Sequence, residues 1–285
     1  MKIESACVEC IIGQSLRVAD AVHADAALRK KIHDDVLAMS KSFDFAESPP
    51  EVARKVYEHL AVLAGKHDLY DEVKRHSTEK AKTFVPYLRE QIAESEDPFL
   101  TALKVAVAGN VIDLAAEVTF DLDAEIDKLF HTPFAHDDTA LLRQKLLSAK
   151  TLLYIGDNAG EHIFDALAIE TFSKLFPELE ITYLTRGRPI INDITYGEAE
   201  ADGLARYARL ADSGVDTPGF AYARASEEAQ KLFDTSDVVL TKGMGNYECL
   251  SPSPRKDLVY LLKVKCGVVS QSIGEEIGSL ICKVV

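Results

Sequence analysis

The stretch that decides the fold is TLLYIGDNAGE, residues 151–161. Its first part, Thr151–Ile155, is an apolar run of strand length, and the residues after Glu161 have the pattern of a helix. An open α/β sheet binds its ligands at the carboxyl ends of its strands, in the loops that lead into the following helices. The sequence therefore places Asp157 and Asn158 where such a fold binds its ligands.

The loop between the predicted strand and helix combines two signals that conflict. Gly156 and Gly160 are typical of a phosphate-binding turn, whereas Asp157 would repel a phosphate on the N-terminus of the helix. A divalent cation held by Asp157 and Asn158 would remove this conflict, because oxygen donors suit hard ions such as Mg²⁺ and Mn²⁺. A capped turn without a ligand is an equally good interpretation of this loop taken alone.

Strand-like and helical segments alternate from residue 151 onward. Apolar runs of strand length lie at residues 151–155, 181–185, 238–241 and 259–264. Helical patterns lie at residues 162–175, 198–210 and 226–233. This alternation predicts a largely parallel sheet with helices on both faces. We therefore expect a Rossmann-like α/β domain over residues 149–285.

The first half of the chain shows helical periodicity, and no segment before residue 150 has the pattern of a strand. The clearest helix starts with Ser48, two prolines and Glu51, which form a possible capping box, and Gly65 stands where a C-terminal cap belongs. Pro86 is expected to kink or divide a long helix over residues 70–94. The sequence predicts an all-helical domain over residues 1–148 that packs closely on the α/β domain.

Composition limits the classes of function. The 285 residues carry a net charge of −14, which argues against a nucleic-acid or anionic-membrane binder, since both need a basic surface. No run approaches the roughly 18 apolar residues of a membrane span, and residues 1–5 lack the apolar core of a signal peptide. Five cysteines, an odd number, fit a reducing compartment better than a disulfide scaffold. We expect a cytoplasmic protein of unknown oligomeric state.

Charged residues follow two more of the predicted strands. Arg186, Arg188 and Asp193 follow the strand at 181–185, and Lys242 follows the strand at 238–241. Phosphoryl transfer needs this mixture, because cations neutralise the phosphate while carboxylates hold a metal ion. Taken singly, Lys242 and Arg188 also fit exposed surface charges. Asp193 follows two isoleucines, so its charge needs a partner.

The motifs gain weight when they are taken together. Asn110 and Asp113 lie three residues apart on one face of a predicted helix, although taken alone they could merely cap helices. With Cys7 and Cys10, the 156–161 loop, the Arg186–Asp193 stretch and the 242–248 stretch, the chain resembles the family once catalogued as domain of unknown function 89. That family is now described as metal-dependent damage-control phosphatases. The resemblance covers essentially the whole chain, and the CxxC pair is similar to that of the short prokaryotic branch.

The resemblance implies a fold and an activity. Members of the family have a helical N-terminal domain joined to a Rossmann-like α/β domain, with the active site between them. They are thought to hydrolyse phosphorylated metabolites, including sugar phosphates and damaged cofactor intermediates, with Mg, Mn, Co or Ni. The resemblance therefore implies a metal-dependent phosphatase that acts on a small phosphorylated metabolite.

The resemblance also implies roles for individual residues. The divalent cation is expected on Asp157, Asn158 and Asp193. The phosphate is expected on Lys242 and the backbone from Gly243 through Gly245 to Asn246. The remaining members of the pocket are expected to be Asn110, Asp113, Glu161 and Arg186. Asp157, Asp193 and Lys242 are thus the expected catalytic residues, and the sequence leaves open whether water or an aspartate attacks the phosphorus atom.

Two other classes of function remain open at this point. One is a non-catalytic metal-binding or redox-responsive protein built around Cys7 and Cys10. The other is a nucleotide- or adenosylmethionine-binding enzyme on the same sheet, which is disfavoured by the acid in the glycine turn and by the missing third glycine of GxGxxG. A closed Cys₄ zinc site is not expected, because the chain has no second CxxC pair.

Overall fold

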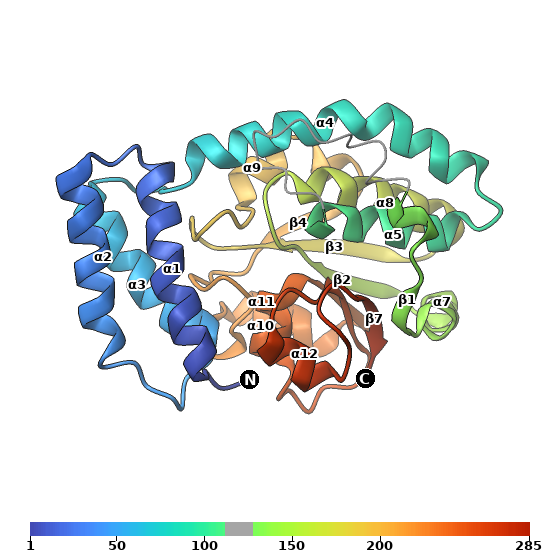
Figure 1. Cartoon of the computed structure of the whole chain (residues 1–285). Helices are drawn as coiled ribbons and strands as arrows, with labels where there is room; N and C mark the ends of the chain where they lie inside the picture. The colour runs from blue at the N-terminus through green and yellow to red at the C-terminus, as the bar shows by residue number, and fades with distance from the viewer. Residues whose placement is uncertain (112–127) are drawn as a thin grey trace.

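The computed structural model describes residues 1–111 and 128–285, and its centre is a seven-stranded sheet (Figure 1). The strands are β1 (Phe134–Asp137), β2 (Thr151–Ile155), β3 (Glu180–Thr185), β4 (Arg209–Asp212), β5 (Val238–Lys242), β6 (Leu258–Lys263) and β7 (Leu280–Val284). Their order across the sheet is β1-β7-β6-β5-β2-β3-β4. Only β6 and β7 pair antiparallel among these strands, so the predicted mostly parallel α/β sheet is confirmed.

Strand β2 lies where the direction of strand addition reverses. After β2 the chain adds β3 and β4 on one side, and it then crosses over to add β5 and β6 on the other side. In an open α/β sheet, the loops diverge at this point and leave a crevice at the carboxyl ends of the strands. The loop after β2 and the residues after β5 therefore face a common crevice.

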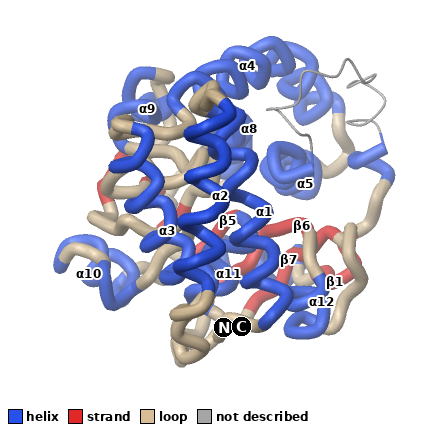
Figure 2. The backbone as a smooth tube through the Cα atoms, turned by 60° about the vertical axis from the view of Figure 1, so that its left-hand side comes forward, coloured by secondary structure: helices blue, strands red, loops and turns tan. Residues whose placement is uncertain are grey.

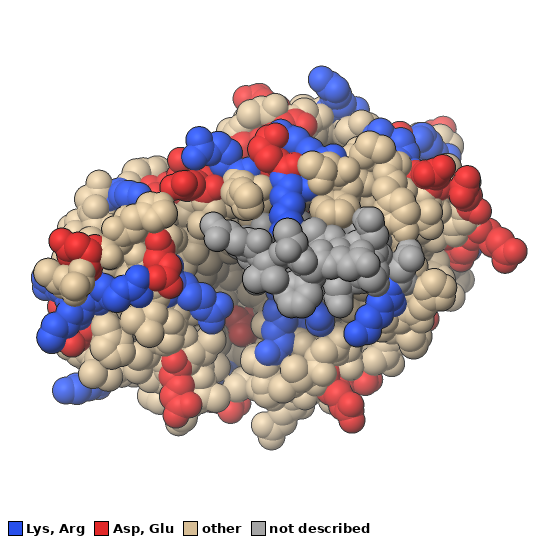
Figure 3. Space-filling model, turned by 45° about the horizontal axis from the view of Figure 1, so that its top comes forward, with Lys and Arg blue, Asp and Glu red and all other residues tan. Residues whose placement is uncertain are grey.

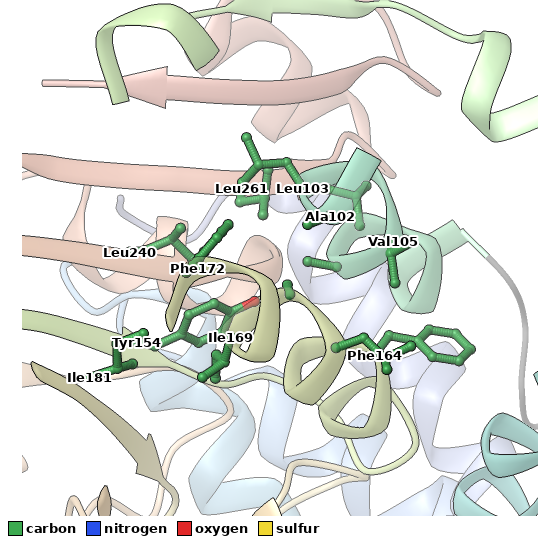
Figure 4. Close-up of a cluster of buried hydrophobic side chains, with 14 of the residues drawn as sticks. Ala102, Leu103, Val105, Tyr154, Phe164, Ile169, Phe172, Ile181, Leu240 and Leu261 are labelled. Carbon is green, nitrogen blue, oxygen red and sulfur yellow. The ribbon is translucent and has the colours of Figure 1, made fainter. Parts of the chain in front are cut away.

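Helices cover both faces of the sheet because both faces are apolar. One face packs on α4 (Asp71–Glu94), α5 (Pro98–Val111) and α8 (Glu161–Leu175). The other packs on α10 (Glu227–Thr235), α11 (Gly243–Leu250) and α12 (Gly267–Ile273). Successive strand residues alternate between the layers, so Tyr154 joins the first core and Ile155 the second. Figure 4 shows the first core, in which Tyr154 and Leu240 lie against Ile169 and Phe172 of α8.

The first three helices form a group beside the sheet (Figures 1 and 2). They are α1 (Ser5–Ala21), α2 (Ala26–Ser40) and α3 (Pro49–Ala64). Their apolar side chains make a separate core that also takes in Ile190, from the loop after β3, and Val268 of α12. These contacts hold the helical group against the loops at the carboxyl ends of the strands.

Two details of the helical half test the sequence prediction. The capping box of Ser48 and Glu51 forms at the start of α3, and Gly65 ends that helix in the left-handed region at φ 63°, as predicted. Helix α4 runs through Pro86 without a break, so the proline does not divide this helix, and the alternative expectation of a kink stays a prediction. Ala81 and Leu88, on either side of the proline, are buried in the same core, and this packing holds both halves in one helix.

The prediction that no strand precedes residue 150 was also wrong. Strand β1 has only one buried residue among its four, so it carries no apolar run, and helix α7 (Thr139–Ser148) follows it. The helix predicted over 198–210 was wrong in its second half, because α9 (Tyr196–Ala201) ends before Gly203 and the chain continues into β4. Strand β7 was not predicted either. The division into domains at residue 148 stays a prediction.

None of the described helices combines the length and the apolar character needed to cross a membrane.

Candidate active site

The loops after β2 and β3 pair through their backbones at the crevice. The amide of Ile194 donates to the carbonyl of Asp157 at 2.9 Å, and the amide of Ala159 donates to the carbonyl of Asn192 at 2.8 Å. Asn158 and Asp193 lie opposite each other in this short antiparallel bridge. The structure therefore brings together the three residues predicted to bind the cation, from two loops that are distant in the sequence.

Arg186 lies between the two acids of this site. Its Nε donates to Asp193 Oδ2 at 2.7 Å, and its Nη2 lies 3.9 Å from Asp157 Oδ1. Its side chain is 1% exposed and also donates to Asn246 Oδ1 at 3.2 Å. Arg186 was predicted to bind substrate, but this geometry gives its guanidinium to protein partners. Arg188 turns away to Asp216 at 2.5 Å.

Asn246 ties the loops of the site together. Its Nδ2 donates to the carbonyls of Gly156, at 3.1 Å, and Lys242, at 2.6 Å. Its Oδ1 accepts from the amide of Phe220 at 2.8 Å as well as from Arg186. Since this side chain is fully buried, it supports the backbone of the predicted phosphate site, and the contact of the Asn246 backbone with a phosphate stays a prediction.

Two glycines of the predicted phosphate-binding stretch permit close packing. Gly243 has φ 76°, and a Cβ atom there would lie 1.9 Å from Asp157 Oδ2. At Gly245 a Cβ atom would lie 2.1 Å from the carbonyl oxygen of Pro218. Only glycine allows the start of α11 to approach Asp157 and the 218–219 loop this closely.

Glu161 and Lys242 extend the site into the core. Asn158 Nδ2 donates to Glu161 Oε1 at 2.8 Å, and Lys242 Nζ lies 3.4 Å from Glu161 Oε2. Lys242 Nζ also donates to Asp165 Oδ1 at 2.8 Å. The side chain of Lys242 is 0% exposed, so in this geometry its ammonium has no contact with the cavity described next.

A cavity of about 310 Å³ opens over the candidate cation ligands. Its floor includes Asp157, Asn158 and Asp193, and its opposite wall comes from α1 and α3 through apolar residues such as Ile11, Pro50 and Ala53. Figure 3 shows a hollow beside these helices with acidic atoms in its depth. The cavity lies between the helical group and the strand ends, where the sequence resemblance expected the active site.

Two charged residues of the cavity, Lys265 and Glu248, had no role in the sequence prediction, although Glu248 ends the 242–248 stretch. Lys265 is exposed and lines the cavity, and Glu248 lines it from α11. Lys265 comes two residues after β6, so its position after an apolar run was the signal that could have found it. Burial raises the pKa of Glu248 to about 7.

The carboxyl groups of the site hold their protons unusually tightly. Burial, followed by the charge of Asp193, raises the pKa of Asp157 to about 7. Burial raises the pKa of Glu161 to about 7 and that of Asp193 to about 6. The cations Arg186, Lys242 and Lys265 oppose this rise for Asp157 but do not cancel it. The site is therefore short of positive charge.

The charge balance and the donor atoms fit a divalent cation. Among the described residues, the buried acids Asp157, Glu161, Asp165 and Asp193 lie against the buried cations Arg186 and Lys242, and burial still raises the pKa of three of the acids. Two carboxylates and an amide oxygen are hard donors that suit Mg²⁺ or Mn²⁺. Within residues 1–111 and 128–285, no three His, Cys, Asp or Glu side chains have the arrangement of a metal site, so a cation on Asp157 and Asp193 would take the amide oxygen of Asn158 as its third side-chain ligand.

Three further predictions concern the cysteines and the helical half. Cys7 and Cys10 are free thiols that line the cavity, and burial raises the pKa of Cys7, which favours the thiol over the thiolate.

Asn110 belongs to α5, but its side chain is outside what the structure describes, and so is Asp113. Gly109 packs on Glu161, where a Cβ atom would lie 2.6 Å from Glu161 Cγ, so α5 backs the site.

Comparison with known proteins now identifies the family. The damage-control phosphatase ARMT1-like domain matches residues 3–281. The chain belongs to this family. This confirms the family that the sequence motifs indicated, whereas the branch suggested by the CxxC pair stays a prediction.

The relatives match over their whole lengths. A damage-control phosphatase of Archaeoglobus fulgidus is 30% identical over an alignment of 294 positions, which covers 100% of both chains. A damage-control phosphatase of Pyrococcus horikoshii is 29% identical over 286 residues, which cover 99% of this chain and 98% of that protein. The crystal structure of a DUF89 family protein from Pyrococcus horikoshii has a TM-score of 0.91 at 28% identity and covers 100% of this chain and 99% of that one.

Replacing Gly243 tests the close packing beside Asp157. Gly243→Ala should displace the Asp157 carboxylate, since the new Cβ atom overlaps Oδ2, and we expect Mn²⁺ affinity to fall at least tenfold. Calorimetric titration with Mn²⁺ measures this. Gly197→Ala, where no atom lies within 4 Å of the new Cβ, is the control and should bind Mn²⁺ as the wild type does. Equal affinity in both variants would contradict the assignment.

The raised pKa values predict how pH affects the metal-free protein. The pKa of Asp157 is about 7 in the folded protein, against about 3.9 in an unfolded chain, so the folded state binds more protons between these values. The Asp157 carboxyl therefore stabilises the folded protein at low pH, and this contribution is lost as the pH rises toward 7. With a chelator present, Asp157→Asn should therefore lose less stability than the wild type between about pH 5 and pH 8. The melting temperatures of both proteins over this pH range measure this. An equal decrease in the wild type and in Asp157→Asn would contradict the prediction.

Proposed function

We propose that the chain is a divalent-metal-dependent phosphatase that hydrolyses a small phosphomonoester, such as a sugar phosphate or a damaged phosphorylated metabolite. The observation that carries the proposal is the convergence of Asp157, Asn158 and Asp193 at the floor of a cavity that also holds the exposed Lys265. A cation and an ammonium group in one cavity suit a phosphate ester, because both neutralise its charge. Two relatives that span the whole chain bear the name damage-control phosphatase.

The two acids and the amide would hold the cation, with Mg, Mn, Co and Ni as the candidates. A cation bound there would polarise a phosphoryl oxygen. Arg186 keeps the carboxylates of Asp157 and Asp193 in their places through its contacts with both. Its charge also limits their mutual repulsion when the protein is free of metal.

Lys265 and the start of α11 would receive the phosphate. Met244 and Gly245, in the first turn of α11, line the cavity together with Lys265. Backbone amides at a helix N-terminus favour an anion, and an exposed ammonium adds a compact positive charge. We therefore assign to Lys265 the phosphate contact that the sequence resemblance implied for Lys242.

The function is tested by a screen of phosphomonoesters after removal of metal. The wild type should release phosphate only when Mg²⁺, Mn²⁺, Co²⁺ or Ni²⁺ is restored. Asp157→Ala should remain folded yet lose both Mn²⁺ binding and turnover, because it removes a carboxylate from the proposed ligand set. Glu228→Ala removes an exposed acid outside the cavity and should keep both. Phosphate release without metal, or full turnover in Asp157→Ala, would refute the proposal.

The role of Lys265 is tested by separating metal binding from turnover. Lys265→Ala should lower kcat/KM about a hundredfold, which corresponds to about 3 kcal/mol of transition-state stabilisation. Its Mn²⁺ affinity should change little, because an ammonium is not a metal ligand. Lys256→Ala, at an exposed lysine outside the cavity lining, provides the control. The assignment fails when the two alanine variants show the same kcat/KM.

A further inference from the structure

A buried polar cluster lies behind the loop after β2, and the proposed chemistry does not use it. Asp165 of α8 and Lys242 at the end of β5 are both 0% exposed, and Lys242 Nζ donates to Asp165 Oδ1 at 2.8 Å. The hydroxyls of Tyr154 and Tyr183 donate to the two oxygens of the same carboxylate at 2.6 and 3.0 Å. Three donors thus fix Asp165 from three different strands of the sheet.

The cluster is connected to the candidate cation ligands through Glu161. Glu161 and Asp165 lie four residues apart on α8, so both carboxylates face Lys242. Asn158 Nδ2 donates to Glu161 Oε1 at 2.8 Å. The same nitrogen donates to Asp157 Oδ2 at 3.1 Å. The ammonium of Lys242 favours the ionised form of Glu161, and an ionised carboxylate only accepts hydrogen bonds, so Glu161 then requires the nitrogen end of the Asn158 amide on its side. This leaves Oδ1, the only amide atom that a hard cation binds, free to act as a ligand.

We propose that Asp165 is a positioning residue that acts through Lys242 and Glu161 on Asn158. Asp165 fixes the ammonium of Lys242, the ammonium holds Glu161, and Glu161 sets which end of the Asn158 amide faces the cation. Asp165 itself touches neither cation nor substrate. The inference rests on the proposed function, and it makes Lys242 an internal counter-ion.

Stability alone does not require these residue types. Buried ion pairs replaced by apolar side chains of similar volume are often no less stable, whereas removal of one partner is costly because the other charge stays buried. A purely structural pair would therefore be replaceable as a unit. A pair that orients a metal ligand would not be replaceable as a unit, because the replacement removes the ammonium group that faces Glu161.

The test uses three variants of the full chain. Asp165→Asn keeps the shape and removes the charge, and Asp165→Asn with Lys242→Met removes both charges. Phe176→Leu is the matched control, since it weakens the packing of the end of α8 on Phe99, three turns away from Asp165, and removes no hydrogen bond of the polar cluster. Each protein is measured for Mn²⁺ affinity without substrate, for melting temperature, and for kcat and KM.

We expect Asp165→Asn to lose Mn²⁺ affinity tenfold to about a hundredfold, as for other residues that support a metal ligand, and to lose kcat more than KM. Phe176→Leu should melt at a lower temperature with unchanged Mn²⁺ affinity. The double variant should regain stability relative to Asp165→Asn but not Mn²⁺ affinity. Tyr183→Phe, which removes one donor to Asp165, should show a smaller loss of affinity in the same direction and covers the case in which Asp165→Asn does not fold.

Two results would overturn the inference. One is wild-type Mn²⁺ affinity in Asp165→Asn with only a lower melting temperature. The other is recovery of Mn²⁺ affinity together with stability in the double variant. A wild type that binds Mn²⁺ but hydrolyses no phosphomonoester would refute the proposed function alone, because the affinity measurements need no substrate. A wild type that binds no Mn²⁺ would refute both.

Discussion

The backbone pairing of two loops is the constraint on which the whole site depends. The loop after β2 and the loop after β3 exchange hydrogen bonds between Asp157 and Ile194 and between Ala159 and Asn192. Side chains on exposed loops move independently, whereas this pairing fixes the backbone on both sides of the candidate cation ligands. Without it, Asp157 and Asp193, which repel each other, would move apart on separate loops.

The paired loops hold more negative charge than their neighbours neutralise. Arg186 contacts Asp157 and Asp193, and Lys242 contacts Glu161 and Asp165 in the core. Burial nevertheless raises the pKa values of Asp157 and Asp193. Such an arrangement costs folding free energy in the absence of a cation, and binding of a cation removes that cost. A site of this kind gains metal affinity by giving up stability.

The two lysines of the region have different environments, and for this reason the proposal gives them different roles. Lys242 is enclosed by Asp165 and Glu161, whereas Lys265 is exposed in the cavity. The helical group contributes mainly apolar residues to the opposite wall, including the buried Cys7. The polar chemistry is thus concentrated on the α/β side, and α1 and α3 enclose the space above it.

The sequence by itself determined the elements that carry the site. The apolar runs of β2, β3, β5 and β6 specify strands because residues buried on both faces of a parallel sheet are apolar throughout. Edge strands lack this signal, so β1, with one buried residue, and β4, which pairs on one side only, were not predicted. The family resemblance likewise implied Asp157, Asn158 and Asp193 as one set.

Only the tertiary structure decided what each charged side chain faces. The pattern around Lys242 and Arg186 is the same whether these side chains point into a cavity or into the core, and the structure turns both toward buried acids. Lys265 follows an ordinary strand and carries no motif, and it enters the cavity because β6 ends beside β5 in the sheet. Local sequence sets which residues stand at a strand end, but the order of the strands determines which of those ends become neighbours.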